Sequence, residues 1–241
     1  MNNNISQPTR TMKDYFNEPV FVLGLPRSGT SMIAGSLSLC GAWTGSTIPG
    51  VAGENPHGFF EHSTIREGII KQLLRLMGGD PAGVTKLPAI NLGASVPGLV
   101  EAFRHAITAD GYANDRPWLY KDAKLTLLWP IVANAFPQAT WVIVTRDRQS
   151  IIDSCLNTSF MRQHSGDISF WRNFVDEYQH RIRMLQNSGR RVLEIRAEDP
   201  INGDFESLQE LAGQTGLTFD RDKVTAFISP ADWHGKTTPH D

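Results

Sequence analysis

The segment Gly24-Leu-Pro-Arg-Ser-Gly-Thr-Ser31 has the residue types and the spacing of a phosphate-binding loop. It follows the apolar run 19–24, which predicts a buried strand, and precedes the apolar stretch 32–40, which predicts a helix. In that position, backbone N–H groups and the positive end of the helix dipole point toward a bound anion. We therefore expect an anion-binding loop formed by Pro26, Arg27, Ser28, Gly29, Thr30 and Ser31.

The loop lacks one residue of the usual nucleotide-binding pattern G-x-x-x-x-G-K-[ST], because Thr30 stands where that pattern has lysine. Kinases and ATPases place this lysine on the β and γ phosphates and hold Mg²⁺ on the next hydroxyl. Arg27 supplies a cation inside the loop instead. Asp122 and Asp147 follow predicted strands, but each sits beside a cation and is not a clear Mg²⁺ ligand. An ATP-dependent small-molecule kinase is the first alternative, and a glycine-rich turn with no ligand is the simplest one.

A second group suited to phosphate lies further along the chain. Arg146 ends the strand predicted over 140–146, and Ser154 follows eight residues later in the helix predicted over 149–156. The forked guanidinium of a strand-end arginine suits a phosphate dianion, and the serine adds a hydroxyl donor. The alternative for Arg146 is a surface ion pair with Asp147 or Asp153.

Four segments, taken in order, resemble sulfotransferases that use 3′-phosphoadenosine 5′-phosphosulfate (PAPS). Residues 21–31 resemble the 5′-phosphosulfate loop of that family, and residues 142–154 resemble its 3′-phosphate motif. Glu54-Asn-Pro-His-Gly-Phe-Phe-Glu61 looks like the Asn-Pro-x-Gly-aromatic-Phe-Glu segment of bacterial sulfotransferases. Tyr120-Lys121-Asp122 resembles the Lys-Asp-Pro segment of the same group and of the tyrosylprotein sulfotransferases.

The resemblance implies that the 24–31 loop binds the 5′ end of PAPS and that Arg146 and Ser154 bind its 3′-phosphate. It implies transfer of the sulfuryl group to a hydroxyl, and less readily to an amine. Ala123 and Arg148 stand where the family usually has proline, and the Gly-rich basic segment of the cytosolic animal enzymes is missing near the C-terminus. The missing segment leaves the adenosine end of the site undefined and makes the bacterial or Golgi-type branch of the family the nearer relative.

Sulfuryl transfer asks for cations and a base. Its transition state is loose, with charge on the bridging and sulfuryl oxygens, so positioning and cationic stabilisation dominate. Arg27 and Lys121 are the candidates for that stabilisation, and no metal is needed in principle. Glu61 is the first candidate for the base that takes the acceptor proton, while Glu54 and His57 are alternatives. A plain helix-terminus carboxylate is the other interpretation of Glu61.

The elements that must position these residues alternate between strands and helices. Helices are expected at 62–77, 97–108, 125–136, 149–156 and 170–185, and strands at 118–121 and 191–195. Asp204 and Asp220 look like N-caps of two final helices. This order predicts an α/β, three-layer sandwich with a mostly parallel central sheet. The resemblance implies the P-loop NTPase-like sulfotransferase form of that architecture.

Composition sets the remaining limits. The 241 residues fit a single domain, expected over 19–241 after a flexible arm at 1–18. With 23 basic and 25 acidic residues, the chain is not a basic nucleic-acid binder. It has no apolar run near 18 residues, and Cys40 and Cys155 form no metal or disulfide pattern, so we expect a cytoplasmic protein. A small molecule, carbohydrate, lipid or peptide could be the acceptor, and a non-catalytic nucleotide-binding protein is a further alternative.

Overall fold

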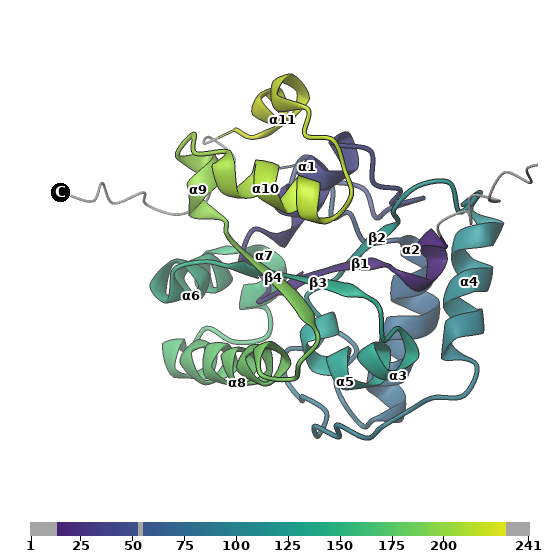
Figure 1. The fold of residues 1–241 in the computed structure, drawn as a ribbon. Coiled ribbons are helices and arrows are strands. Elements are labelled where there is room, and N and C mark those ends of the chain that lie inside the picture. The colour runs from purple at the N-terminus through teal and green to yellow at the C-terminus, as the bar shows by residue number, and fades with distance from the viewer. Residues whose placement is uncertain (1–13, 53–54, 230–241) are drawn as a thin grey trace, which may run out of the picture.

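The computed structural model describes residues 14–52 and 55–229. At their centre lies a parallel sheet (Figure 1). The strands are β1 (Val20–Gly24), β2 (Leu119–Lys121), β3 (Thr140–Thr145) and β4 (Arg191–Arg196). Their order is β2-β1-β3-β4, and every neighbouring pair is parallel. β1 is central, and its residue Val22 is in register with Lys121 on one side and with Val142 on the other. The predicted parallel sheet is therefore confirmed.

Helices cover both faces of the sheet, as the alternation predicted. Along β1 and β3, successive side chains point to opposite faces. Val22 and Val144 pack with α1 (Thr30–Leu39), α10 (Glu206–Gln214) and α11 (Arg221–Phe227). Leu23 and Ile143 pack on the other face with the helices α4 (Leu99–Ala109), α5 (Leu125–Ala135) and α8 (Ile168–Gln186). In Figure 1, α1, α10 and α11 lie above the sheet and α5 and α8 lie below it, which gives three layers, while α4 stands at the right-hand side.

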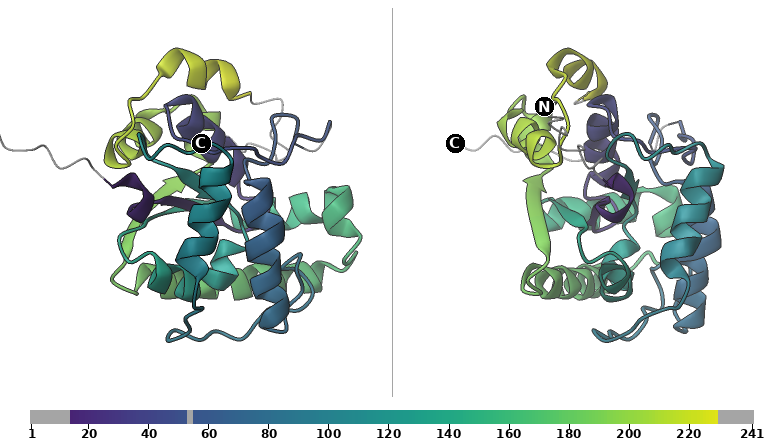
Figure 2. Two further views of the ribbon diagram at one scale, coloured as in Figure 1. Left: turned by 90° about the vertical axis from the view of Figure 1, so that its right-hand side faces the viewer. Right: turned by 45° about the vertical axis from the view of Figure 1, so that its right-hand side comes forward.

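The helix predicted over 62–77 contains a π-helical turn. It consists of α2 (Ser63–Ile65), the π segment η2 (Arg66–Ile70) and α3 (Lys71–Leu76). Figure 2 shows this stretch side by side with α4 at one flank of the molecule. A π turn contains one residue more than an α-helical turn, and such turns frequently occur at functional sites. Hydrophobic periodicity alone did not reveal this one.

Several short elements were not predicted. They are η1 (Tyr15–Asn17), α7 (Ser159–Arg162) and α9 (Glu198–Ile201), beside the expected α6 (Arg148–Asn157). Phe16 of η1 is buried, so the described end of the predicted arm packs on the core. Asp220 caps α11 as expected, because its side chain accepts from the Lys223 N–H. Asp204 accepts from the Glu206 N–H instead, one residue before the assigned cap. Within the described ranges, no helix has the length and apolar character required to cross a bilayer.

Candidate active site

A cavity of about 630 Å³ lies at the carboxyl end of the sheet. Residues that follow β1, β2 and β3 all reach it, among them Arg27, Lys121 and Arg146. Open parallel sheets bind ligands at this edge, because the loops after the strands meet there. The cavity also takes wall residues from the segment 55–61, from η2 and α3, and from α7.

The predicted phosphate loop has the backbone of an anion cradle. Gly24 is required, because a Cβ there would lie 2.5 Å from the Val144 carbonyl oxygen and 2.7 Å from Ser28 Oγ. Gly29 has φ of 89° and Arg27 has φ of 71°, the left-handed region that a non-glycine residue rarely adopts. Strain of this kind is found mostly at ligand sites. The loop backbone is thus held in an unusual shape directly before α1.

The backbone N–H donors of this loop lie at the start of α1. The first N–H groups of a helix have no carbonyl partner within the helix, so they can donate to a ligand. The Ser28 N–H is an exception, because it donates to the Leu25 carbonyl and is no longer available to a ligand. Ser28 Oγ is buried and has no hydrogen-bond partner among the described residues. Ser28 does not line the cavity, whereas Gly29, Thr30 and Ser31 do, so the start of α1 is the part of the loop that is open to an anion.

The two predicted phosphate motifs meet at Arg27. Its Nε donates to Ser154 Oγ at 3.0 Å, and Arg146 Nη1 donates to the Arg27 carbonyl at 2.8 Å. Burial lowers the pKa of Arg146 to about 10, against the attraction of Glu198, so the guanidinium remains charged at neutral pH. Two arginines and a serine from distant parts of the sequence therefore lie together at one end of the cavity.

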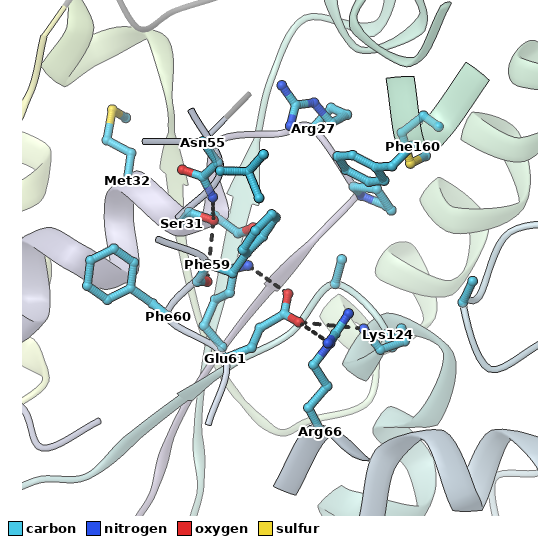
Figure 3. Close-up of a pocket in the computed structure, with 18 of the residues that line it drawn as sticks. Arg27, Ser31, Met32, Asn55, Phe59, Phe60, Glu61, Arg66, Lys124 and Phe160 are labelled. Atoms are coloured by element: carbon cyan, nitrogen blue, oxygen red, sulfur yellow. Dashed lines mark hydrogen bonds and ion pairs between the residues drawn. The ribbon is translucent and has the colours of Figure 1, made fainter. Parts of the chain in front are cut away.

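Phe160 of the unpredicted helix α7 covers this arginine. The Arg27 guanidinium carbon lies 5.9 Å from the centre of the Phe160 ring, a cation–π distance (Figure 3). Phe59 faces Phe160 with ring centres 6.5 Å apart. The pair forms an apolar band between the loop and the opposite wall of the cavity.

Glu61, the first candidate for the base, lies in a group of cations. Its side chain is buried, and Lys121 Nζ donates to Oε1 at 2.9 Å. Arg66 Nε lies 2.8 Å from Oε2 as an ion pair whose angle is poor for a hydrogen bond. Lys124 Nζ is 3.8 Å from the same oxygen (Figure 3). Two candidates from separate sequence segments, Glu61 and Lys121, are thus in direct contact.

These cations control the ionisation of Glu61. Burial by itself raises the pKa of the carboxyl group. The positive charges of Lys121 and Lys124 outweigh burial and bring the pKa of Glu61 down to about 2. In this arrangement Glu61 is fully ionised at neutral pH and is a weak base.

A second buried carboxylate supports the lysines. Asp122 Oδ1 lies 2.8 Å from Lys124 Nζ and accepts from the Lys124 N–H, while Tyr120 donates its hydroxyl to Oδ2 at 2.9 Å. Asp147 is used elsewhere, since its side chain caps α6 by accepting from the Ser150 N–H. Both acids that follow strands β2 and β3 therefore already have protein partners.

The segment that carries Glu61 bends sharply beside the loop. Asn55 Nδ2 donates to Ser31 Oγ at 3.2 Å, and Ser31 Oγ reaches the Phe59 carbonyl at 3.4 Å (Figure 3). Phe60 has φ of 53°, again in the left-handed region. His57 lies at the exposed rim of the cavity with its ring 4.9 Å from that of Phe227. Glu54, the other predicted alternative, lies outside the described residues.

A polar clamp fixes the far end of the same segment. Asp110, at the end of α4, accepts from the Ser46 N–H and hydroxyl, and its Oδ2 lies 3.2 Å from His62 Nε2. His62 Nδ1 accepts from the Ile65 N–H as the cap of α2, and burial lowers the pKa of this histidine. The Ile48 N–H bonds the Glu61 carbonyl. Glu61 is held through its backbone as well as through its ion pairs.

Lys121 was predicted from the sequence, but the two other cations beside Glu61, Arg66 and Lys124, were missed. Lys124 was not singled out, although it lies only three residues after Lys121 and could have been noticed as a second lysine at the end of the same strand. Arg66 gave no signal, because one arginine near the start of an amphipathic helix is an ordinary surface residue. Phe160 lies on α7, a short helix that was not predicted.

Comparison with known proteins places the chain in a family. Its sequence matches the model of the sulfotransferase family over residues 19–221, so the chain belongs to that family. Among curated proteins, none matches the sequence. The fold is similar to the sulfotransferase domain of the olefin synthase of Synechococcus PCC 7002, with 16% identity, a TM-score of 0.53, and 93% of this chain and 90% of that chain covered.

Two further solved structures are similar at lower scores. A sulfotransferase from Alicyclobacillus acidocaldarius has 17% identity and a TM-score of 0.49, covering 88% of this chain and 92% of its own. A sulfotransferase from Mycobacterium tuberculosis has 14% identity and a TM-score of 0.47, covering 90% of this chain and 73% of its own. The family model confirms the expected family, and the similarity to the Synechococcus domain confirms the expected P-loop-like α/β fold.

Proposed function

We propose that this protein transfers the sulfuryl group of PAPS to a hydroxyl group, and less readily to an amine, of an acceptor. The observation that supports this most is the junction at Arg27, which joins the phosphate loop to Arg146 and Ser154. It provides two cationic binding points at one end of a cavity. A donor with phosphates at both the 5′ and the 3′ positions needs two such points.

In this proposal each group of residues has a separate role. Residues 26–31 hold the 5′ phosphosulfate, and Arg146 with Ser154 holds the 3′-phosphate. Arg27 and Lys121 stabilise the charge that develops on the bridging and sulfuryl oxygens. A bond forms between the acceptor oxygen and sulfur while the bond from sulfur to the phosphate oxygen breaks, giving a sulfate ester and adenosine 3′,5′-bisphosphate.

Glu61 accepts the acceptor proton in this proposal, with His57 and Glu54 as alternatives. Because Lys121 keeps the pKa of Glu61 low, the carboxylate becomes a better base when Lys121 turns from it toward the charge on the donor. The same movement brings Lys121 to the bridging and sulfuryl oxygens, on which negative charge develops.

A kinase activity has less support. Besides the absent loop lysine, Asp122 is engaged by Lys124 and Tyr120, and Asp147 caps α6. Neither carboxylate that follows a strand is free for Mg²⁺ without losing these bonds.

The decisive experiment is a transfer assay with ³⁵S-labelled PAPS and pooled acceptors, run beside γ-labelled ATP with the same pools. We expect label transfer from PAPS only. Calorimetry should show tighter binding of adenosine 3′,5′-bisphosphate than of AMP, because in this proposal Arg146 and Ser154 hold the 3′-phosphate. Equal affinity for the two nucleotides, or transfer from ATP alone, would overturn the proposal. Tight bisphosphate binding without any transfer would indicate a non-catalytic nucleotide-binding protein.

A further inference from the structure

The wall of the cavity opposite the phosphate loop is built by η2 and α3 and carries three cations. Arg66, Lys71 and Arg75 all line the cavity. The Lys71 N–H bonds the Arg66 carbonyl, five residues earlier, which is the hydrogen bond of a π turn. Lys71 and Arg75 are then four apart, the spacing of neighbours on one α-helical face. Because the π turn contains one extra residue, Arg66 lies on the same face of the helix as Lys71 and Arg75.

The three cations differ in how firmly they are held. Arg66 pairs with buried Glu61 and with Glu67. Lys71 Nζ lies 2.8 Å from a Glu67 carboxylate oxygen, but the Glu67 side chain is 50% exposed, and such solvent-exposed pairs are weak. Arg75 makes no ion pair with any residue of the described ranges. Arg75, and to a lesser degree Lys71, can therefore bind an anionic group of a ligand.

Asp80, an acidic residue on the same wall, forms no ion pair with Lys71 or Arg75 among the described residues. Its carboxylate accepts from the N–H groups of Ala82, Val84 and Thr85 and from the Thr85 hydroxyl. Those bonds fix the turn that follows α3 and use the lone pairs of the acid. Asp80 is a structural carboxylate of the loop.

Apolar side chains separate the cation row from the phosphate loop. Phe59, Phe160 and Val84 all line the cavity. A molecule that fits has a hydroxyl at Glu61, an apolar body and a negative group at the far end. In a pocket with a mostly apolar lining and a few charged groups, the apolar surface contributes affinity and the charged groups fix the orientation of the ligand.

We propose that the acceptor carries an anionic group, a carboxylate, sulfate or phosphate, that Arg75 and Lys71 bind while its hydroxyl faces Glu61. This inference rests on the proposed sulfuryl transfer, since it assigns the acceptor class for the same cavity. The bidentate guanidinium of Arg75 supplies most of the recognition. Lys71 contributes less, because it must leave Glu67.

The test uses hydroxylated acids paired with their neutral methyl amides. 3-(4-Hydroxyphenyl)propanoate, 16-hydroxyhexadecanoate and glucuronate represent carboxylates, and 4-hydroxybenzyl phosphonate, paired with its neutral dimethyl ester, represents the phosphate class. Wild-type protein should give kcat/KM about tenfold or more higher for the anion than for its neutral partner in at least one pair. Arg75→Met should bring that ratio toward one, and Lys71→Met should lower it less. Lys86→Met, an equal charge loss at an exposed residue outside the cavity lining, should keep the wild-type ratio.

Calorimetry with the same pairs, in the presence of adenosine 3′,5′-bisphosphate, separates this inference from the proposed function. Anion binding that depends on Arg75, without sulfuryl transfer to any pair, supports the anion site and overturns the proposed function. Transfer with neutral and anionic partners used equally overturns the anion site alone. Binding of neither partner, or equal loss of the ratio in Arg75→Met and Lys86→Met, also overturns it.

Discussion

The two ends of the cavity hold their charges in opposite ways. At the phosphate-loop end, Arg27 donates to a serine hydroxyl and Arg146 donates to a backbone carbonyl, while Glu198 attracts Arg146. At the carboxylate end, buried charges of opposite sign contact each other, as in Glu61 with Lys121 and Asp122 with Lys124.

The difference has a consequence for ligand binding. Neutral hydrogen bonds orient a guanidinium without cancelling its charge, so we expect Arg27 and Arg146 to bind an anion with little rearrangement. Buried ion pairs satisfy one another, so a lysine at the carboxylate end can serve a ligand only by giving up a carboxylate. One end is preorganised, and the other must exchange partners during the reaction.

The largest effect is expected from Glu61→Gln. If this residue is the base, turnover should fall by about 10²–10⁴ while bisphosphate affinity is retained. The protein should also lose stability, because removing one partner of a buried ion pair costs about 3–5 kcal/mol. Single-turnover rates and chemical denaturation measure the two effects separately.

A double variant separates base chemistry from charge balance. Lys121→Met combined with Glu61→Gln removes both members of the pair and should recover part of the lost stability, since no unpaired lysine remains buried. Activity should stay low. Near-normal turnover in Glu61→Gln alone would make Glu61 a counter-ion only, and His57→Ala and Glu54→Gln would then identify the base.

Arg27→Met is expected to have the next largest effect. Loss of a charge aimed at the developing sulfuryl charge should lower turnover by about 10²–10³. Bisphosphate affinity should fall less, because Arg146 and Ser154 remain. Rates with PAPS and calorimetry with the bisphosphate give the comparison, and Arg172→Met, an exposed arginine away from the cavity, is the control. Equal losses in rate and affinity would make Arg27 a simple binding residue.

The same contrast explains what the sequence could predict. The sequence indicated an anion-binding loop and Arg146 because glycines, short strands and a strand-end arginine are local features, a few residues apart. It also offered Glu61 and Lys121 as candidates, but it did not predict their contact. The carboxylate end depends on side chains that meet across 60 residues, as Lys121 does with Glu61. Arg66 faces the cavity only because η2 is a π turn, and no residue pattern announces that turn.

Acid should weaken the carboxylate end selectively. The pKa of Glu61 is held at about 2 in the folded protein, below its ordinary value of 4.5. Its contribution to stability is therefore present above pH 4.5 and is lost as the pH falls toward 2. Denaturation midpoints measured between these limits should fall more steeply in the wild type than in the double variant Lys121→Met with Glu61→Gln. Equal slopes for the two proteins would show that Glu61 keeps an ordinary pKa.

The smallest effect, and the sharpest distinction between reaction classes, is expected at Asp147. Its carboxylate caps α6 at the phosphate-loop end by accepting from the Ser150 N–H at 2.7 Å. Asn caps a helix about as well as Asp, so Asp147→Asn should leave both stability and sulfuryl transfer close to wild type. Asp147→Ala should lose about 1 kcal/mol of unfolding free energy with little change in turnover. A metal-binding aspartate of a kinase behaves differently, because an amide is a poor substitute for a carboxylate on Mg²⁺. Loss of activity in Asp147→Asn at unchanged stability would therefore contradict the capping role and return the phosphate loop to nucleotide-dependent phosphoryl transfer.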